Sequence, residues 1–260
     1  MVVRLYGTWA VLALTAGGYL HASITVVPQA EFHRTYSLNP NGRIVIQNLY
    51  GDVRITAWNR DEVMVEAVKK SSDPRQLDDA RIVVDSSESQ ISIRTQYAGS
   101  TAEHPASVEY RIMIPRTANL EDVKLTNGGL SITGLAGSVK ARAVNGSIRA
   151  EGLQGQVELS TINGRLEAEF DRVSRLNSIS LSSVNGPIRL FLPARTGALV
   201  TAHNLSGGIQ TDFGRALRSA GGHSLRTTMN RGGAQIRVHN VNGGISIRAH
   251  GNGRSQRPCT

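Results

Sequence analysis

The sequence predicts an all-β fold, a parallel β-solenoid whose rungs contain about 18 residues each. The first observation behind this prediction is a glycine that recurs every nine residues through the middle of the chain. The second is an aliphatic side chain two residues after each glycine, and the third is an asparagine before every second glycine. A fixed period of this kind indicates a stack of similar units, here two short strands with a turn after each. The glycines of this regular block are Gly128, Gly137, Gly146, Gly155 and Gly164.

Before the regular block, alternation of apolar and polar residues predicts several strands that each bury one face. Asp73 and Pro74 predict the start of a short helix, with Leu77 and Ala80 facing inward. Pro115 ends the last of the strands because it cannot donate a hydrogen bond to a β-ladder. The predicted strands lie at residues 43–46, 52–55, 63–67, 82–84, 91–93 and 108–114.

The regular block covers residues 123–170, and beyond it the spacing loosens while the motif persists. An asparagine or serine, one or two glycines and then an isoleucine recur around residues 185, 207 and 243. Residues 213–233 are rich in glycine and arginine and break the pattern. For this segment we predict a long loop or an irregular rung.

An antiparallel β-meander or sandwich is the alternative fold, because Asn-Gly between alternating segments is also the strongest short hairpin signal. A meander that turns at the central Asn-Gly places Arg142 opposite Arg149, an unfavourable pair. A solenoid with an 18-residue offset instead places Lys140 beside Glu158. Each such pair contributes only ~0.2–1 kcal/mol, so the charges favour the solenoid and leave the meander open.

In the solenoid, equivalent residues of neighbouring rungs lie side by side. Asn145 then stacks on Asn163, and Arg149 lies beside Glu167. Asparagine tolerates the left-handed backbone conformation that such corners need. Stacked asparagines can also form a ladder of side-chain amides.

The N-terminus has the pattern of an export signal. Arg4 supplies the positive end, residues 9–20 are apolar, and Ala22 is a suitable last signal residue. The apolar run is shorter than the ~20 residues that a membrane span needs, so we expect an exported protein that is periplasmic, at the cell surface or secreted. The predicted division is an export signal at 1–22, a linker at 23–35, a single solenoid domain at 36–250 and a disordered tail at 251–260.

The sequence predicts no metal or cofactor site. The only cysteine, Cys259, allows no internal disulfide framework, and the seven histidines show no recognised metal spacing. Calcium-binding nonapeptide repeats need an aspartate at the sixth position, and no double glycine is followed by the lysine and hydroxyl of a P-loop. The sixth positions here are Thr133, Arg142, Glu151, Ser160 and Glu169.

The chain is basic, with 29 Lys and Arg against 20 Asp and Glu and a formal net charge of +9. From Arg195 to the end it contains nine arginines and a single acid, Asp212. Such a field favours anionic partners, and the planar arginine side chain grips phosphate and carboxylate with two contacts. The candidate anion-binding residues, all in the irregular segment, are Arg215, Arg218, Arg226 and Arg231.

Several motifs together are distinctive. They are Gly42-x-Ile44, Gly51-Asp52-Val53-x-Ile55, Trp58-Asn59 with Val63-x-Val65, Tyr110-x-Ile112-x-Ile114-Pro115 and the repeated Asn-Gly-x-aliphatic units. On these motifs the chain resembles the bacterial putative-adhesin family, a domain of unknown function in exported and envelope proteins, over roughly residues 36–250. The resemblance implies a right-handed, β-helix-like solenoid and an envelope location. The family has no established catalytic residues, so none is carried over.

The sequence therefore favours a non-catalytic, adhesin-like binding or scaffolding module at the cell envelope. Its expected partner is an anionic envelope polysaccharide or lipid, with peripheral membrane contact and no nucleic acid. One alternative is a carbohydrate-active enzyme on a β-helix, which needs two carboxylates that face one groove. The other is a nucleic-acid-binding protein, which the export signal and the small number of aromatic stacking residues (four Phe, six Tyr and two Trp) disfavour.

Overall fold

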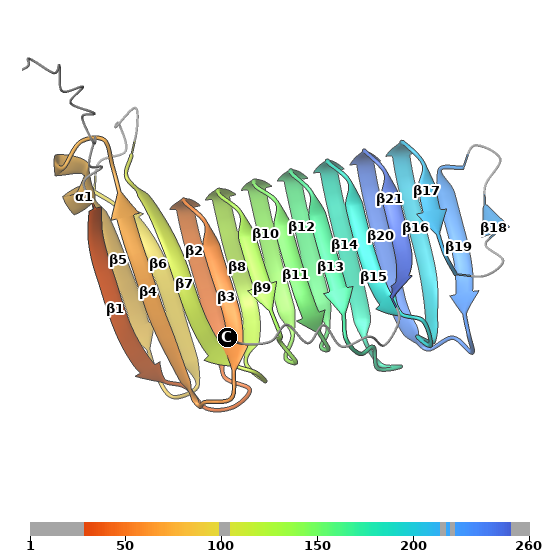
Figure 1. Ribbon diagram of the computed structural model, residues 1–260, viewed down its shortest axis with the longest axis horizontal. Coiled ribbons are helices and arrows are strands. Elements are labelled where there is room, and N and C mark those ends of the chain that lie inside the picture. The colour runs from red at the N-terminus through yellow and green to blue at the C-terminus, as the bar shows by residue number, and fades with distance from the viewer. Residues whose placement is uncertain (1–28, 99–104, 214–216, 219–221, 251–260) are drawn as a thin grey trace, which may run out of the picture.

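The computed structural model describes residues 29–98, 105–213, 217–218 and 222–250, and the predicted export signal and C-terminal tail lie outside these residues. Two long β-sheets extend along the molecule and face each other, one in front of the other in Figure 1. The ten-stranded sheet has the order β1 (Gln29–Ser37), β4 (Glu62–Lys70), β7 (Ser107–Pro115), β3 (Val53–Trp58), β9 (Leu130–Thr133), β11 (Ile148–Leu153), β13 (Leu166–Phe170), β15 (Ile188–Pro193), β21 (Ile245–His250), β17 (Ile209–Thr211).

The second sheet has eleven strands, and a single short helix, α1 (Arg75–Asp79), precedes one of its edges. Its order is β18 (Leu217–Arg218), β19 (Ser224–Met229), β16 (Ala198–Ser206), β20 (Ala234–Asn242), β14 (Ser178–Asn185), β12 (Val157–Asn163), β10 (Val139–Asn145), β8 (Asn119–Asn127), β2 (Arg43–Tyr50), β6 (Gln90–Tyr97), β5 (Ala80–Ser86).

The strands in the middle of both sheets are parallel. This confirms the predicted stacking of equivalent strands and excludes the antiparallel meander. In the regular block β10 pairs with β12 so that Asn145 lies beside Asn163, an offset of 18 residues. In the other sheet Ile148 of β11 lies beside Leu166 of β13 at the same offset. The offset grows to 22 residues between β12 and β14 and to 57 between β14 and β20. The 18-residue offset between paired strands therefore occurs within the regular block and not throughout the domain.

The core lies between the two sheets, because successive side chains of a strand point to opposite faces. Ile148 is 1% exposed, whereas its neighbour Arg149 is on the outside. The predicted charge pairs form on this outer surface. Lys140 Nζ lies 3.1 Å from Glu158 Oε2, and Arg149 Nη1 lies 3.3 Å from Glu167 Oε1.

Antiparallel strands close both ends of the solenoid. At the N-terminal end β1 and β4 are antiparallel to each other, as are β4 and β7, and β5 and β6. The prediction of a linker through residue 35 is wrong from residue 29 onward, because β1 pairs along its whole length with β4 and packs Phe32 and Tyr36 against the core. At the other end β19 pairs antiparallel with β16, inside the segment predicted to be irregular.

The rungs near the C-terminal end do not follow the order of the sequence. After β15 the chain forms β16 and β17, and only later returns to form β20 and β21. This later rung lies between the earlier two, with β20 paired to both β14 and β16. Strands from residues 198–206 and 234–242 thus become direct neighbours.

Helix α1 agrees with the prediction at its start. Asp73 Oδ1 accepts a hydrogen bond from the backbone N–H of Arg75 at 3.0 Å, in the turn where the helix begins. Leu77 packs partly against the core, as expected. Ala80 is fully buried, but it is the first residue of β5 rather than part of the helix.

The corner glycines of successive rungs lie in direct contact. A Cβ on Gly146 would lie 1.9 Å from the carbonyl oxygen of Gly128, and one on Gly186 would lie 2.0 Å from that of Gly164. These separations are far below any contact that a real Cβ makes. Only glycine therefore allows the corner to stack at this distance.

The asparagines before these glycines form the expected amide ladder. In each step the side-chain Nδ2 of one asparagine donates to the Oδ1 of the preceding rung at 2.9 Å. The ladder crosses the rungs whose spacing is irregular as well as the regular block. It contains Asn127, Asn145, Asn163, Asn185 and Asn242.

The glycine contacts predict that Gly146→Ala destabilises the fold. Overpacking against backbone that cannot move aside costs about 1–3 kcal/mol, which urea denaturation would measure. Gly208→Ala is the matched control, because a Cβ there meets no atom within 4 Å. Equal unfolding midpoints for the two variants would contradict the stacking argument.

The ladder predicts a graded response to alanine substitution. Asn163→Ala removes one donated and one accepted hydrogen bond, whereas Asn242→Ala at the ladder end removes only the bond to Asn185. Each bond contributes about 0.5–1.5 kcal/mol, so the interior variant should be roughly twice as destabilised. Thermal unfolding of the two variants beside the parent protein tests this, and a larger effect at Asn242 would refute it.

Candidate anion-binding face

The outer surface of β14, β20, β16 and β19 carries the candidate site, which we call the basic face. Alternation along these strands turns Arg226, Arg237, His203 and His239 outward, and all four side chains are exposed. His203 pairs directly with His239 across β16 and β20. Thr201 lies between the two arginines, because it pairs with Arg237 on one side and Arg226 on the other. The four basic side chains thus share one flat surface over three adjacent strands.

The basic face differs from the middle of its sheet because its four strands are adjacent and none contains an acid, whereas the acid-free strands β2, β6 and β10 each adjoin a strand that carries one. Strands β14, β20, β16 and β19 contain no aspartate or glutamate. On β10 and β12, by contrast, both cations have a carboxylate partner, because Lys140 and Arg142 lie 3.1 and 3.6 Å from the carboxylate oxygens of Glu158. Over the part of the chain that the structure describes, Arg226 and Arg237 have no carboxylate partner.

The single acid of the C-terminal third lies near the other sheet. Arg248 Nη1 donates to Asp212 Oδ1 at 2.6 Å, and the backbone N–H of Ala249 donates to Oδ2 at 3.2 Å. The hydrogen bond from Arg248 lowers the pKa of Asp212 below its usual value. Asp212 therefore offsets Arg248 at the end of β21 and not the arginines of the basic face.

The structure separates the four arginines that the sequence singled out. Arg226 lies in β19, so of the two predictions for this segment, a long loop or an irregular rung, a paired strand forms at this residue, and Arg226 joins the basic face. Arg231 is exposed in the turn between β19 and β20, away from that face. Arg218 ends the two-residue strand β18, and Arg215 lies outside the described residues.

Sequence reasoning missed Arg237, His203 and His239. The alternation in β20 could have marked Arg237 and His239 as outward residues, since it is regular from Ala234 to Asn240. The contact between the histidines joins two strands that are not consecutive in the chain. Its 36-residue offset is also the offset between Ser206-Gly207-Gly208-Ile209 and Asn242-Gly243-Gly244-Ile245, and this repeated motif could have marked the two strands as neighbours.

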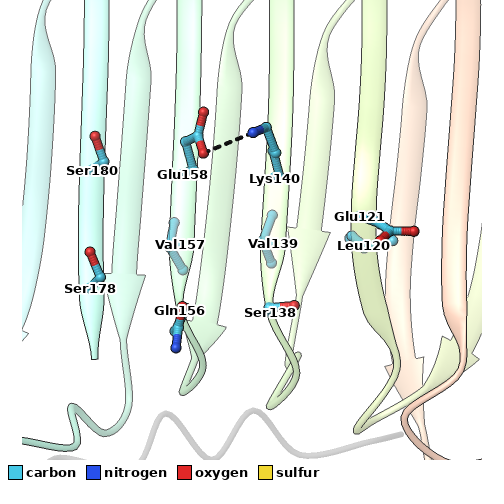
Figure 2. Close-up of a pocket in the computed structure, with 10 residues that line it drawn as sticks. All are labelled: Leu120, Glu121, Ser138, Val139, Lys140, Gln156, Val157, Glu158, Ser178 and Ser180. Carbon is cyan, nitrogen blue, oxygen red and sulfur yellow. Dashed lines mark ion pairs between the residues drawn. The ribbon is translucent and has the colours of Figure 1, made fainter. Parts of the chain in front are cut away.

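A shallow groove of about 300 Å³ crosses the starts of β8, β10, β12 and β14, and it contains two glutamates (Figure 2). Figure 2 shows Glu158 directed at Lys140, and Glu121 Oε2 lies 3.9 Å from Arg43 Nε. Both glutamate side chains are about half exposed. A glycosidase needs two carboxyl groups that converge on one bound sugar, whereas Glu158 is directed at Lys140 and Glu121 lies beside Arg43. This groove therefore does not favour the enzyme alternative.

A buried polar cluster links strands at the N-terminal end of the core. Thr95 Oγ1 lies 2.7 Å from Tyr110 Oη and donates to Asn48 Oδ1 at 2.9 Å. Asn48 Nδ2 in turn donates to the carbonyl of Val108 at 2.9 Å. Burial raises the pKa of Tyr110 to about 12, although the hydrogen bond with Thr95 opposes the shift. The tyrosine stays protonated at neutral pH, and its role is structural.

Two features are absent from residues 29–98, 105–213, 217–218 and 222–250. No three His, Cys, Asp or Glu side chains within them gather into a set that could hold a metal ion. No helix among them is long and apolar enough to cross a membrane.

Similarity to known proteins agrees with the fold. The structure of a putative cell adhesion protein from Clostridium sporogenes superposes with a TM-score of 0.51 at 10% identity, covering 85% of this chain and 100% of that one. A putative adhesin from Bacteroides fragilis has a TM-score of 0.48 at 11% identity, with coverages of 85% and 97%. The first of these likenesses shows a shared fold, and no curated protein sequence matches the chain.

The family is shown by sequence. The model of the Toastrack DUF4097 domain matches residues 41–248, which is most of the chain and nearly the whole region that resembles the putative-adhesin family. The protein therefore belongs to the Toastrack DUF4097 family.

Proposed function

We propose that this protein is a non-catalytic, adhesin-like binding module of the cell envelope, which holds an anionic polysaccharide or lipid on its basic face. The observation that carries the proposal is the grouping of Arg226, Arg237, His203 and His239 on strands without a carboxylate. Arginine suits this role because its planar fork makes paired contacts with phosphate and carboxylate.

The architecture supports a polymer or a surface as the partner. Neighbouring strands lie about 4.8 Å apart, so the basic side chains sit on a flat and rigid array rather than in a pocket. An array of this kind matches an extended ligand that carries charge at intervals. The partner needs no conformational change in the protein, because every basic side chain of the face is held on a paired strand.

Two further observations support an envelope location. The first is the predicted export signal, with Arg4 before an apolar run that ends near Ala22. The second is the fold shared with a C. sporogenes protein named as a putative cell adhesion protein. An exported protein meets acidic polysaccharides and anionic lipids as its abundant anionic partners. Nucleic acid is less abundant there.

Two substitutions on the basic face test the proposal. The variant Arg226→Ser/Arg237→Ser should bind lipopolysaccharide and dextran sulfate about tenfold or more weakly than the parent in low salt. Its affinity should also depend less on salt, because exposed charge contacts are screened as the Debye length falls from ~10 Å at 0.1 M to ~3 Å at 1 M. Isothermal titration calorimetry across a salt series measures both quantities.

The matched control is Arg54→Ser/Arg189→Ser, which removes the same charge from the outer surface of the ten-stranded sheet. It should bind almost as the parent does. If both double variants lose affinity equally, the net charge and not the basic face governs binding. Release of oligosaccharide product during incubation would instead support the enzyme alternative.

A further inference from the structure

A second group of arginines lies at the edge of the molecule, on the turns that precede β14, β20 and β16. These turns lie along the lower edge of the solenoid in Figure 1, below the C-terminal half of the eleven-stranded sheet. We call their exposed basic side chains the basic rim. Its members are Arg172, Arg175, Arg195 and Arg231.

Hydrogen bonds hold the three turns side by side. Asn230 Nδ2 donates to the carbonyl of Thr196 at 2.6 Å, which ties the turn before β20 to the turn before β16. The N–H of Ala234 donates to the carbonyl of Gly197 at 3.0 Å. On the other side the N–H of Gln235 donates to the carbonyl of Asn177 at 2.9 Å. The arginines of the basic rim are therefore gathered by the interleaved order of the rungs.

One leucine projects from the same rim. Leu176 is 89% exposed, more than any other large apolar side chain in the described residues. Its position is fixed, because the next residue, Asn177, is buried and donates to the carbonyls of Gln154 and Gly155, both at 2.8 Å. The adjacent Ser174 accepts a hydrogen bond from the Leu176 N–H at 3.3 Å and closes the turn. An apolar side chain is thus held outward among arginines.

The nearest acid does not cancel the charge of the rim. Asp171 begins the turn before β14, and its Oδ2 lies 3.5 Å from where a Cβ on Gly152 would be, on the side of the ten-stranded sheet. The turns before β16 and β20, residues 194–197 and 230–233, contain no acid. Four arginines therefore share the rim with a single carboxylate at its border.

We propose that the basic rim docks edge-on to an anionic lipid bilayer, with Leu176 inserted among the headgroups. The inference rests on the proposed function, because it names the anionic partner as a membrane surface. Basic clusters are attracted to anionic headgroups, and an apolar side chain beside them adds burial at the interface. A soluble polysaccharide could bind the arginines but would not bury an exposed leucine. The exposed Leu176 therefore favours a lipid bilayer over a soluble polysaccharide as the partner.

Binding of the full-length protein to vesicles tests the inference. The vesicles contain phosphatidylcholine with or without a quarter of phosphatidylglycerol, and co-sedimentation gives the partition coefficient. Each arginine near an anionic surface contributes about fivefold in affinity, so Arg175→Ser/Arg195→Ser/Arg231→Ser should weaken binding to the anionic vesicles by about 100-fold. Leu176→Ser should weaken it by about fivefold and leave dextran sulfate binding unchanged.

Two matched controls separate this site from general effects. Leu205→Ser removes another exposed leucine, 73% exposed, at the opposite end of β16, and should partition as the parent does. Arg54→Ser/Arg111→Ser/Arg189→Ser removes three positive charges from the other sheet and should cost less than tenfold. Thermal unfolding of each variant confirms that it is folded.

The outcomes distinguish this inference from the function on which it rests. If the rim variants partition like the parent while Arg226→Ser/Arg237→Ser does not, the basic face binds the membrane and the rim does not. If the parent binds dextran sulfate and ignores anionic vesicles, the partner is a soluble polyanion and the inference is wrong. If the parent binds neither, the proposed function is wrong as well.

Discussion

The close approach of backbone at the Asn-Gly corner is the constraint on which the rest of the structure depends. Each corner glycine lies so near the glycine of the preceding rung that no side chain fits between them. This contact brings the asparagines into line, and their amides then bond from rung to rung at 2.9 Å. Once the corners are aligned, the register of the strands that follow is fixed. The position of each residue after the corner then decides whether its side chain points inward or outward.

This alignment explains why charge is organised in rows along the outer surface. In a parallel stack, residues at the same distance from the corner become neighbours, so each outward column is a row of side chains at strand spacing. In the regular block the outward columns contain both signs and produce pairs such as Lys140 with Glu158 and Arg149 with Glu167. Toward the C-terminal end of the eleven-stranded sheet the columns continue without acids. The arginines of the basic face therefore lack the carboxylate partners that such columns supply in the regular block.

The irregular end of the solenoid is where the candidate sites lie. Because β20 is inserted between β14 and β16, three turns that are far apart in the chain become neighbours at one edge. The same insertion places His203 beside His239 on the outer surface. The antiparallel strand β19 then extends the sheet and adds Arg226. Departure from the repeat, rather than the repeat itself, thus creates the two arginine clusters.

The sequence by itself determined the regular block, because there the repeat encodes both the turn and the burial of each residue. The 18-residue register of Asn145 with Asn163, the amide ladder and the buried position of Ile148 all follow from it. The order of the rungs at the ends was decided only by tertiary structure. Beyond the block the spacing varies, so several pairings satisfy the same alternation, and which one forms depends on which sheet edge each strand can cover.

The candidate sites divide in the same way. The excess of arginine near the C-terminus is a property of the sequence, and one of these arginines, Arg226, lies on the basic face. The neighbours of Arg226 lie on strands that are not consecutive in the chain, because Thr201 of β16 is its direct partner and β16 in turn pairs with β20. Likewise β1 carries no repeat motif and becomes a strand only because β4 offers it an open edge. Local patterns specify which face a side chain occupies, whereas contacts between distant segments decide what lies next to it.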